Sequence, residues 1–525
     1  MSSEFDAVIV GAGHNALACA AHLSAKGWRV GVFEQAARPG GAVKTLELTA
    51  PGFRHDWGAM NLSLFAGSAF HGTYGEELSR HGLEFAPVSD VFASVFPDGR
   101  WLGVSTDLDA TSASIGGFSA ADAETWRRLA AGFGAEAAQI FALLGSPMRK
   151  GALARFGWGL WRDRGAGGAL DLGRFLIESP RAWLTRSFES PELRAALGAW
   201  GMHLDFAPDI AGGALFPYLE AMAAQNMGMV LGKGGAGTMI DALSGMVEAH
   251  GGTIECGAPV ARILREGGRA SGVDLADGRR VTARRAVIAG TAPRNLIDGL
   301  LEGESGDAGY DAKMRSFAHA PGTMMIHLAM EDLPDWAAGA ELRRFAYVHI
   351  APSLDHMARA YAQAQAGLLP EAPVVVVGQP GTVDPTRAPE GKHTLWLQVR
   401  MAPAEIAGDA AGRIEATDWD GAAAPFAERV LDMLEAYAPG TRDRIIARHV
   451  VSPRDLEADN PNLVGGDQIC GSHHLAQHFL FRPARGHAGG ETPVAGLHLT
   501  GAAVWPGAGA GAGSGYMLGR RLAGA

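Results

Sequence analysis

The sequence predicts an α/β protein in which a nucleotide-binding domain of parallel strands and helices is interleaved with a second, α+β domain. The chain opens with an apolar strand, a glycine turn, a helix and a second strand, the order of a nucleotide-binding unit. Strand and glycine-turn patterns return before residue 300 and again at the C-terminus, after long alanine- and leucine-rich stretches. We therefore place the first domain in residues 1–70, 226–300 and 456–525, and the second in residues 71–225 and 301–455.

The first unit carries the chemistry of a phosphate site. Residues 7–10 are apolar and predict a buried parallel strand. Gly11 then allows a sharp turn, and Gly13 lets the backbone approach a pyrophosphate. A helix predicted from about residue 16 to 25 directs its first N–H groups at that phosphate. Ala16 stands where a third glycine is usual, and the position needs only a small residue for helix–strand packing.

A second predicted strand, from Trp28 to Phe33, ends at Glu34. A carboxylate at the end of the second strand is placed to bind a ribose 2′-hydroxyl, and it would repel a 2′-phosphate. The site therefore favours a dinucleotide other than NADP. The pair Gly40 and Gly41 follows shortly after the acid.

A later segment, GMVLGKGGAGTMIDAL, could be a second dinucleotide site, with Glu255 as its acid. Its glycines are Gly232, Gly234 and Gly237. The preceding apolar run is short, however, and Lys233 lies inside the turn. We therefore favour a glycine-rich entry into a helix.

Composition excludes several classes of protein. The chain has 525 residues and a net charge of −11, which argues against nucleic acid as a partner. Three widely spaced cysteines fit neither a disulfide framework nor a zinc cluster, and they favour a reducing compartment. A strand begins almost at residue 1, and no apolar run reaches the roughly 18 residues of a membrane span. We expect a cytoplasmic protein, or one attached peripherally to the inner face of the membrane.

The basic segment, residues 148–164, is the element that could make such a contact. It carries five positive charges and one negative charge, interleaved with aromatic side chains, in an otherwise acidic protein. A segment of this kind can lie on an anionic bilayer. The alternative is an ordinary helical surface with a few packing aromatic residues.

Taken together, these motifs resemble the phytoene-desaturase-like flavoproteins, relatives of the amine oxidases and of the Rab GDP-dissociation inhibitors. The resemblance covers nearly the whole chain. It implies a Rossmann-type FAD-binding domain interleaved with an α+β substrate domain, and non-covalent FAD, because no cysteine or histidine is placed to form a flavin linkage. Its sharpest segments are Gly11–Ala16 with Glu34, Gly40 and Gly41, then GKGGAGTMIDAL through Val260, and the C-terminal LTGAAVWPGAGAGAGSG.

The resemblance also assigns roles to the cofactor loops. Val260 would contact the adenine through its backbone, and GFRHDWGAM, with Gly58, Ala59 and Met60, would pass the isoalloxazine. The turn at Gly501 and Ala502 and the helix that begins near Ser514 and Gly515 would hold the ribityl and phosphate groups. Ala42 replaces the arginine that often follows the glycine pair, and Lys44 stands nearby.

Catalytic residues are harder to predict. His473 or His474 is our candidate proton acceptor, with His55 and Asp56 as rivals; Asp56 has a structural hydrogen-bonding role as its alternative. Trp505 is expected near the flavin ring, with packing as the alternative. His474 and His478 would lie one turn apart on a helix, but no third zinc ligand is evident, so we predict no metal.

The predicted function is FAD-dependent oxidation of a long apolar or polyene-like substrate, by desaturation or isomerisation with hydride transfer to flavin N5. An amine or alcohol oxidase acting on a smaller molecule is the enzymatic alternative. A lipid or prenyl carrier on the same fold is the non-enzymatic one. The pattern does not name the electron acceptor.

Overall fold

The computed structural model describes residues 3–524, and its architecture confirms the predicted α/β fold. Seven strands form a nucleotide sheet in the order β10-β11-β12-β1-β2-β9, with β20 paired to β12. The bounds are β1 (Ser3–Val10), β2 (Val30–Glu34), β9 (Thr253–Cys256), β10 (Val260–Glu266), β11 (Arg269–Leu275), β12 (Arg280–Ala289) and β20 (Leu497–Leu499). Because β1 lies parallel between β2 and β12, its residues 7–10 are buried on both faces.

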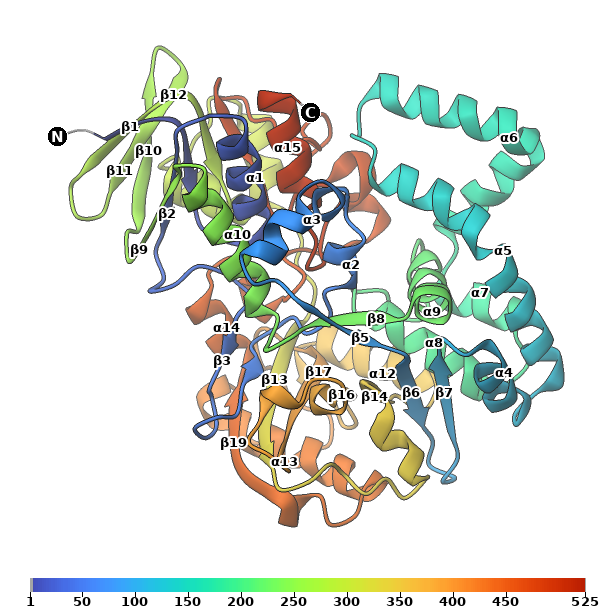
Figure 1. Cartoon of the computed structure of the whole chain (residues 1–525). Helices are drawn as coiled ribbons and strands as arrows, with labels where there is room; N and C mark the ends of the chain where they lie inside the picture. Colours follow the sequence, from blue (N-terminus) through green and yellow to red (C-terminus); the bar gives the residue numbers. More distant parts are fainter. Residues whose placement is uncertain (1–2, 525) are drawn as a thin grey trace.

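Helices from three parts of the chain pack together beside the nucleotide sheet (Figure 1). They are α1 (His14–Ala25), α3 (Ala69–Arg80), α10 (Gly237–Ala249) and α15 (Gly513–Ala523). In α3, the Thr73 hydroxyl lies 2.9 Å from that of Tyr516, and Tyr74 shares a 2.8 Å hydrogen bond with His22. The domain boundary predicted at residue 70 therefore cuts through α3, a helix of the first domain. The structure places this boundary after Arg80, where α3 ends.

The second sheet has the strand order β19-β13-β17-β16-β14-β6-β7. The bounds are β6 (Asp90–Val95), β7 (Trp101–Ser105), β13 (Gly322–Met330), β14 (Tyr347–Ile350), β16 (Val374–Gly378), β17 (His393–Ala402) and β19 (Ile445–Val451). One face is aliphatic, and it packs on α13 (Trp419–Tyr437). That face carries Ile326, Leu328, Leu395, Leu397, Val399, Val375 and Val377.

The opposite face of the second sheet shares a core with a layer of helices. These helices are α4 (Leu108–Gly116), α5 (Ala120–Leu144), α7 (Pro180–Ser187), α8 (Pro191–Met202), α9 (Leu215–Met227) and α12 (Leu354–Gln365). Helix α6 (Lys150–Ile177), which follows α5 in the chain, bends at Gly165, where φ is +70°. It extends away from the rest of the molecule (Figure 1).

The remaining short elements lie outside the two seven-stranded sheets. They are β3 (Thr45–Leu46), β4 (His55–Asp56), α2 (Ser63–Ala66), β5 (Phe85–Val88), β8 (Met229–Gly232), α11 (Ala308–Arg315), β15 (Leu368–Leu369), β18 (Gly408–Asp409) and α14 (Pro453–Asp459). Strand β8 pairs antiparallel with β5, outside the nucleotide sheet, and Lys233 forms a surface ion pair with Glu84. The glycine-rich segment before α10 thus lacks the parallel strand of a second dinucleotide unit.

Two predicted boundaries shift slightly. Helix α1 begins at His14 instead of residue 16, because Gly13 is already its N-cap. The second strand covers residues 30–34 instead of 28–33. Trp28 lies outside it, with the Arg285 guanidinium 3.6 Å from its ring centre.

A buried ion pair fixes the junction between the two domains. Arg387, which is fully buried, donates from Nη1 to Asp56 and from Nε to Asp384, both at 2.8 Å. Its Nη2 donates to the carbonyl oxygen of Gly232 at 2.9 Å, and its own carbonyl accepts the N–H of Arg54 at 2.8 Å. One side chain therefore ties together three distant parts of the sequence.

Candidate functional site

The turn after β1 leads directly into α1. Gly11 has φ +88°, which glycine adopts without strain. Gly13 caps the helix without a side-chain hydrogen bond, so the first helical N–H groups remain available to an anion. Ala16 is buried, and a Cβ on Gly290, just beyond β12, would lie 3.3 Å from its methyl group. The position therefore admits only a small side chain, and alanine satisfies it.

A second helix begins beside the first. At Gly515 the backbone of α15 approaches α1 so closely that a Cβ would collide with the carbonyl oxygen of Asn15. Both residues lie in the first turn of their helices, so the two positive helix ends come together. The Ser514 hydroxyl accepts the N–H of Gly501 at 3.1 Å, which fixes the C-terminal glycine turn at the same place.

The glycines at these helix ends leave room for a pyrophosphate. A Cβ built on Gly13 or on Gly501 meets no described protein atom within 4 Å. Gly40 forms a β-bridge with Gly13, and a Cβ on Gly41 would lie 3.4 Å from the Gly13 Cα. Free N–H donors, two positive helix ends and open space beside the backbone fit the diphosphate of FAD.

Glu34 and Val260 lie together at the other end of this cradle. The Glu34 carboxylate is buried, and it accepts the N–H groups of Ala12 at 2.6 Å and Ala36 at 2.9 Å. The N–H of Ala258 donates to the Glu34 carbonyl at 2.9 Å, two residues before Val260 begins β10. These contacts place a carboxylate and the half-buried start of β10 where the ribose and adenine of FAD would lie.

The flavin segment, Trp57–Met60, connects the glycine loops to the second sheet. A Cβ on Gly58 would lie 3.0 Å from the carbonyl oxygen of Ala42, just after the glycine pair. The same Cβ would be 3.7 Å from Nε2 of Gln468. The methionine of the segment lies against Gly378 of β16. The chain thus passes from the phosphate cradle to the surface of the second sheet within a few residues.

That surface is unlike the aliphatic face behind it, and we call it the polar face. Directly paired residues on neighbouring strands share a face of the sheet. Its polar and aromatic members in register are His449, His327, Trp396 and Tyr347 in one row, Gln398, His349 and Ser94 in the next, then Thr323 and Arg400. The apolar Met325, Val374 and Val376 lie between them on the same face. Trp57 stacks on His327 with ring centres 6.4 Å apart, and Gln398 donates to Gln468 at 2.7 Å. The flavin segment therefore lies directly on the polar face.

Several buried polar atoms here have no hydrogen-bond partner within residues 3–524. They are Nε1 of Trp57, Trp200 and Trp396, Oε1 of Gln398, Nε2 of Gln468 and His203, and both ring nitrogens of His327 and His349. Each such atom costs about 1–3 kcal/mol of stability. Burial lowers the pKa of His349 to about 3, so its ring is neutral. Buried donors and acceptors without a protein partner are atoms that a bound ligand or an ordered water would satisfy.

The predicted proton acceptors have other tasks. His473 is buried, its Nε2 accepts the N–H of Ala508 at 3.0 Å, and burial holds the pKa of its ring well below the ordinary value. His474 donates from Nε2 to the carbonyl oxygen of Asp205 at 2.8 Å and lies 3.1 Å from the Asp205 carboxylate. Both side chains position loops, and this geometry does not support the role predicted for them.

Asp56 and Trp505 are also held by the protein. The Asp56 carboxylate accepts hydrogen bonds from Thr45 Oγ1 at 2.7 Å and from the N–H of Ala236 at 2.8 Å, besides its pairing with Arg387. All of these donors are protein groups, as expected for a structural hydrogen-bonding role. The buried Trp505 donates its indole N–H to the carbonyl oxygen of Ser146 at 3.0 Å, which supports packing.

The histidine pair does not form a helical metal motif. His474 and His478 flank separate 3₁₀ turns, at Leu475–Gln477 and Phe479–Phe481. His478 packs against Trp505, with ring centres 5.2 Å apart. Within the described part of the chain, no three histidine, cysteine, aspartate or glutamate side chains are grouped to hold a metal ion.

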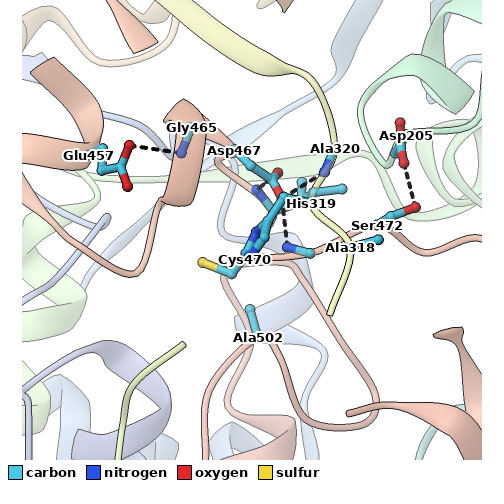
Figure 2. Close-up of polar contacts among 12 residues, drawn as sticks. Asp205, Ala318, His319, Ala320, Glu457, Gly465, Asp467, Cys470, Ser472 and Ala502 are labelled. Atoms are coloured by element: carbon cyan, nitrogen blue, oxygen red, sulfur yellow. Dashed lines mark hydrogen bonds and ion pairs between the residues drawn. The ribbon is translucent and has the colours of Figure 1, made fainter. Parts of the chain in front are cut away.

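Figure 2 shows how the loop that carries Gln468 is fixed. Asp467 accepts the N–H groups of Gly471 at 2.7 Å and of Ala320 at 3.0 Å. The fully buried Arg482 donates to the carbonyl oxygens of Ser472 at 2.8 Å and of Ala502 at 2.7 Å. Arg482 therefore binds this loop to the C-terminal glycine turn.

The polar face was missed in the sequence, although a signal for it exists. In LWLQVR, residues 395–400, polar or aromatic side chains alternate with aliphatic ones. Trp396, Gln398 and Arg400 must share one face of any strand formed there. Alternation inside a strand that is buried on both faces would have identified a functional surface.

We predict that Gly13→Val abolishes FAD retention while leaving the fold intact. The residue has φ −69° and ψ 159°, which valine adopts readily, and its side chain would enter space that holds no protein atom. The flavin absorbance of the purified variant measures retention. Gly134→Val, on the exposed face of α5, is the matched control and should keep its flavin. Full flavin occupancy in Gly13→Val would contradict the assignment of the cradle.

Comparison with known proteins identifies the family. The sequence model for flavin containing amine oxidoreductases matches residues 17–297, more than half of the chain. Pyridine nucleotide-disulfide oxidoreductase domain-containing protein 2 from Rattus norvegicus is 28% identical, covering 97% of this chain and 91% of its own. Phytoene desaturase (neurosporene-forming) from Cereibacter sphaeroides is 25% identical, covering 96% and 91%.

Solved structures agree on the fold. An oxidoreductase from Methanosarcina mazei superimposes with a TM-score of 0.60 at 19% identity, over 97% of this chain and 98% of its own.

The predicted cofactor, FAD, and the prediction of an enzyme are both confirmed, and the carrier alternative is not supported. The chain belongs to the flavin containing amine oxidoreductase family and is an FAD-dependent oxidoreductase.

Proposed function

We propose that this oxidoreductase desaturates a long apolar, polyene-like substrate that it collects from a membrane surface. One hydrogen of the substrate would leave as hydride, for which FAD supplies the acceptor when bound. The polar face and the flavin segment are the surfaces that would hold the reacting carbons. The observation that carries the proposal is the exposure of large apolar side chains on helix α6.

Helix α6 exposes apolar side chains that a protein in water normally buries. Of its 28 residues only Ala152 is buried. The exposed fractions are 63% for Trp158, 50% for Trp161, 75% for Leu170 and 60% for Ile177. A projecting apolar helix of this size is unfavourable in water unless a partner covers it.

The charge on the same helix indicates the partner. Arg155, Arg162 and Arg164 are exposed beside the tryptophans, and the whole basic segment has an excess of positive charge. Each cationic residue near an anionic bilayer contributes about 1 kcal/mol, and long basic side chains can keep their charge at the lipid headgroups. No helix within residues 3–524 has the length and apolar character needed to cross a bilayer. The proposed contact is therefore peripheral.

A cavity connects this helix to the C-terminal turn. It has a volume of about 340 Å³, and its lining includes Pro147 and Arg149 just before α6, and Val504, Trp505 and Ser514 beside the cofactor turn. The wall is mainly apolar, with Arg149 near the start of α6 and Arg520 and Arg521 from α15. A route from the base of the exposed helix towards the cofactor site supports delivery of an apolar molecule from the bilayer.

We predict that the protein floats with anionic liposomes at low salt and that high salt releases it, because the Debye length shortens as salt rises. Changing Arg155, Arg162 and Arg164 to Glu should lower the vesicle partition coefficient more than about 100-fold, since at least three contributions of roughly 1 kcal/mol are lost. The matched control changes Arg294, Arg359 and Arg413, exposed elsewhere, to Glu. Equal loss in both triple variants would exclude α6 as the anchor.

We further predict that phytoene, carried in vesicles of anionic phospholipid, bleaches the flavin absorbance of the wild-type protein under anaerobic conditions. Phytoene is the probe because it gives its name to relatives of this chain. Neutral vesicles should support slower reduction, because the enzyme would bind them less well. No reduction in either vesicle, with full FAD content, would contradict the proposed substrate class.

A further inference from the structure

The cavity between the base of α6 and helix α15 has arginine side chains in an otherwise apolar wall. Its volume is about 340 Å³, and the arginines are Arg149, Arg520 and Arg521. Ligand pockets in proteins have volumes of about 300–1,000 Å³, so this cavity is large enough for one small or single-chain molecule. A wall of this composition fits a molecule that is itself apolar and carries one charged end.

The apolar part of the wall leaves no polar atom for a ligand chain to satisfy. The indole N–H of Trp505 already donates to the carbonyl oxygen of Ser146 at 3.0 Å, so its ring offers only an apolar surface. Met517 packs against the buried cluster that contains Trp505, and its flexible side chain adapts to the shape of a neighbour. The other apolar side chains of the wall are Pro147, Ala488 and Val504.

The three arginines carry more positive charge than their protein partner neutralises. Glu491 pairs with Arg149 and with Arg521 through the same oxygen, Oε1, which lies 2.6 Å from Nη2 of Arg149. Arg520 makes no ion pair within residues 3–524, and its guanidinium lies 5.6 Å from the ring centre of Tyr516. Among these four charged side chains, three guanidinium groups and one carboxylate leave two positive charges.

One of these guanidinium groups is partly removed from water. Only 22% of the Arg521 side chain is exposed. Gly489 leaves room for it, because a Cβ at this position would lie 2.7 Å from Nη1 of Arg521 and from Oε1 of Glu491. Charges that are partly buried are screened less by water and salt than charges on an open surface. An anion beside Arg521 would therefore be held more strongly than one on the exposed surface.

We propose that this cavity binds a single-chain anionic lipid, with its carboxylate or phosphate on the arginines and its chain along the apolar wall. The planar guanidinium group pairs with either anion through two parallel hydrogen bonds. The cavity adjoins the base of α6, so a lipid from a bilayer in contact with that helix would enter directly. Binding requires no turnover and is independent of the proposed reaction. While bound, the chain would occupy the route proposed for the substrate.

Calorimetric titration of the FAD-loaded protein tests the ligand class. The probes are decanoate, decyl phosphate and 1-decanol, each below its solubility limit and micelle concentration. We expect one decanoate or decyl phosphate per protein, bound about 10- to 100-fold more tightly than 1-decanol, because only the anions form charge-assisted hydrogen bonds. The tighter anion distinguishes a fatty acid from a phosphate-bearing lipid. Equal affinities for both anions and the alcohol would overturn the proposal.

A double variant tests the arginines. Arg149→Gln combined with Arg520→Gln removes both surplus charges and leaves the third arginine paired with Glu491. It should bind decanoate at least about 10-fold less tightly and 1-decanol as before. The matched control, Arg294→Gln with Arg413→Gln, removes the same charge from exposed positions elsewhere and should bind both probes like wild type. Unchanged binding of decanoate by the first variant would contradict the assigned head-group site.

Further variants distinguish the cavity from the exposed face of α6. Met517→Trp enlarges a side chain of the cavity wall and should weaken binding of decanoate and of 1-decanol, whereas Met227→Trp, at an exposed position of α9, should not. The change of Arg155, Arg162 and Arg164 to Glu should retain the preference for decanoate over 1-decanol. Flavin absorbance and the unfolding midpoint show that each variant is folded. Loss of this preference, with Met517→Trp binding like wild type, would place the lipid on α6 and overturn the proposal.

Discussion

The fully buried guanidinium of Arg387 is the contact on which the arrangement of the two domains depends. It pairs with Asp56, four residues before the end of the flavin segment, with Asp384, and with the carbonyl oxygen of Gly232. Removing one member of a buried pair leaves an uncompensated charge and costs about 3–5 kcal/mol. The three chain segments therefore cannot separate cheaply, and the flavin segment stays on the polar face.

Two features of the molecule are unfavourable for folding, and the proposed function accounts for both. The polar face keeps unpaired donors and acceptors in the interior, where aliphatic side chains would make the folded protein more stable. Helix α6 exposes tryptophan and leucine to water. Violations of folding rules that lack local compensation are expected at functional sites. Here they occur where a substrate would be oxidised and where it would be collected.

The cofactor cradle could be predicted because its chemistry is local: the turn at Gly11 and Gly13, the small Ala16 and the acid Glu34 follow one another along the chain. The polar face could be predicted only as an alternation in β17, because which side meets the flavin segment depends on the Arg387 junction. The hydrogen-bond partners of His473 and His474, Ala508 and Asp205, are remote in sequence, so these contacts could not be predicted.

The central claim is that the cofactor spans from the glycine cradle to the polar face, so that its ring meets the substrate there. A crystal structure of the FAD-loaded protein tests this most directly. The account predicts the diphosphate beside Gly13 and Gly501, and the isoalloxazine in contact with the flavin segment, Trp57–Met60, and with Gln468. A ring held away from these residues, with the polar face packed against protein alone, would contradict it.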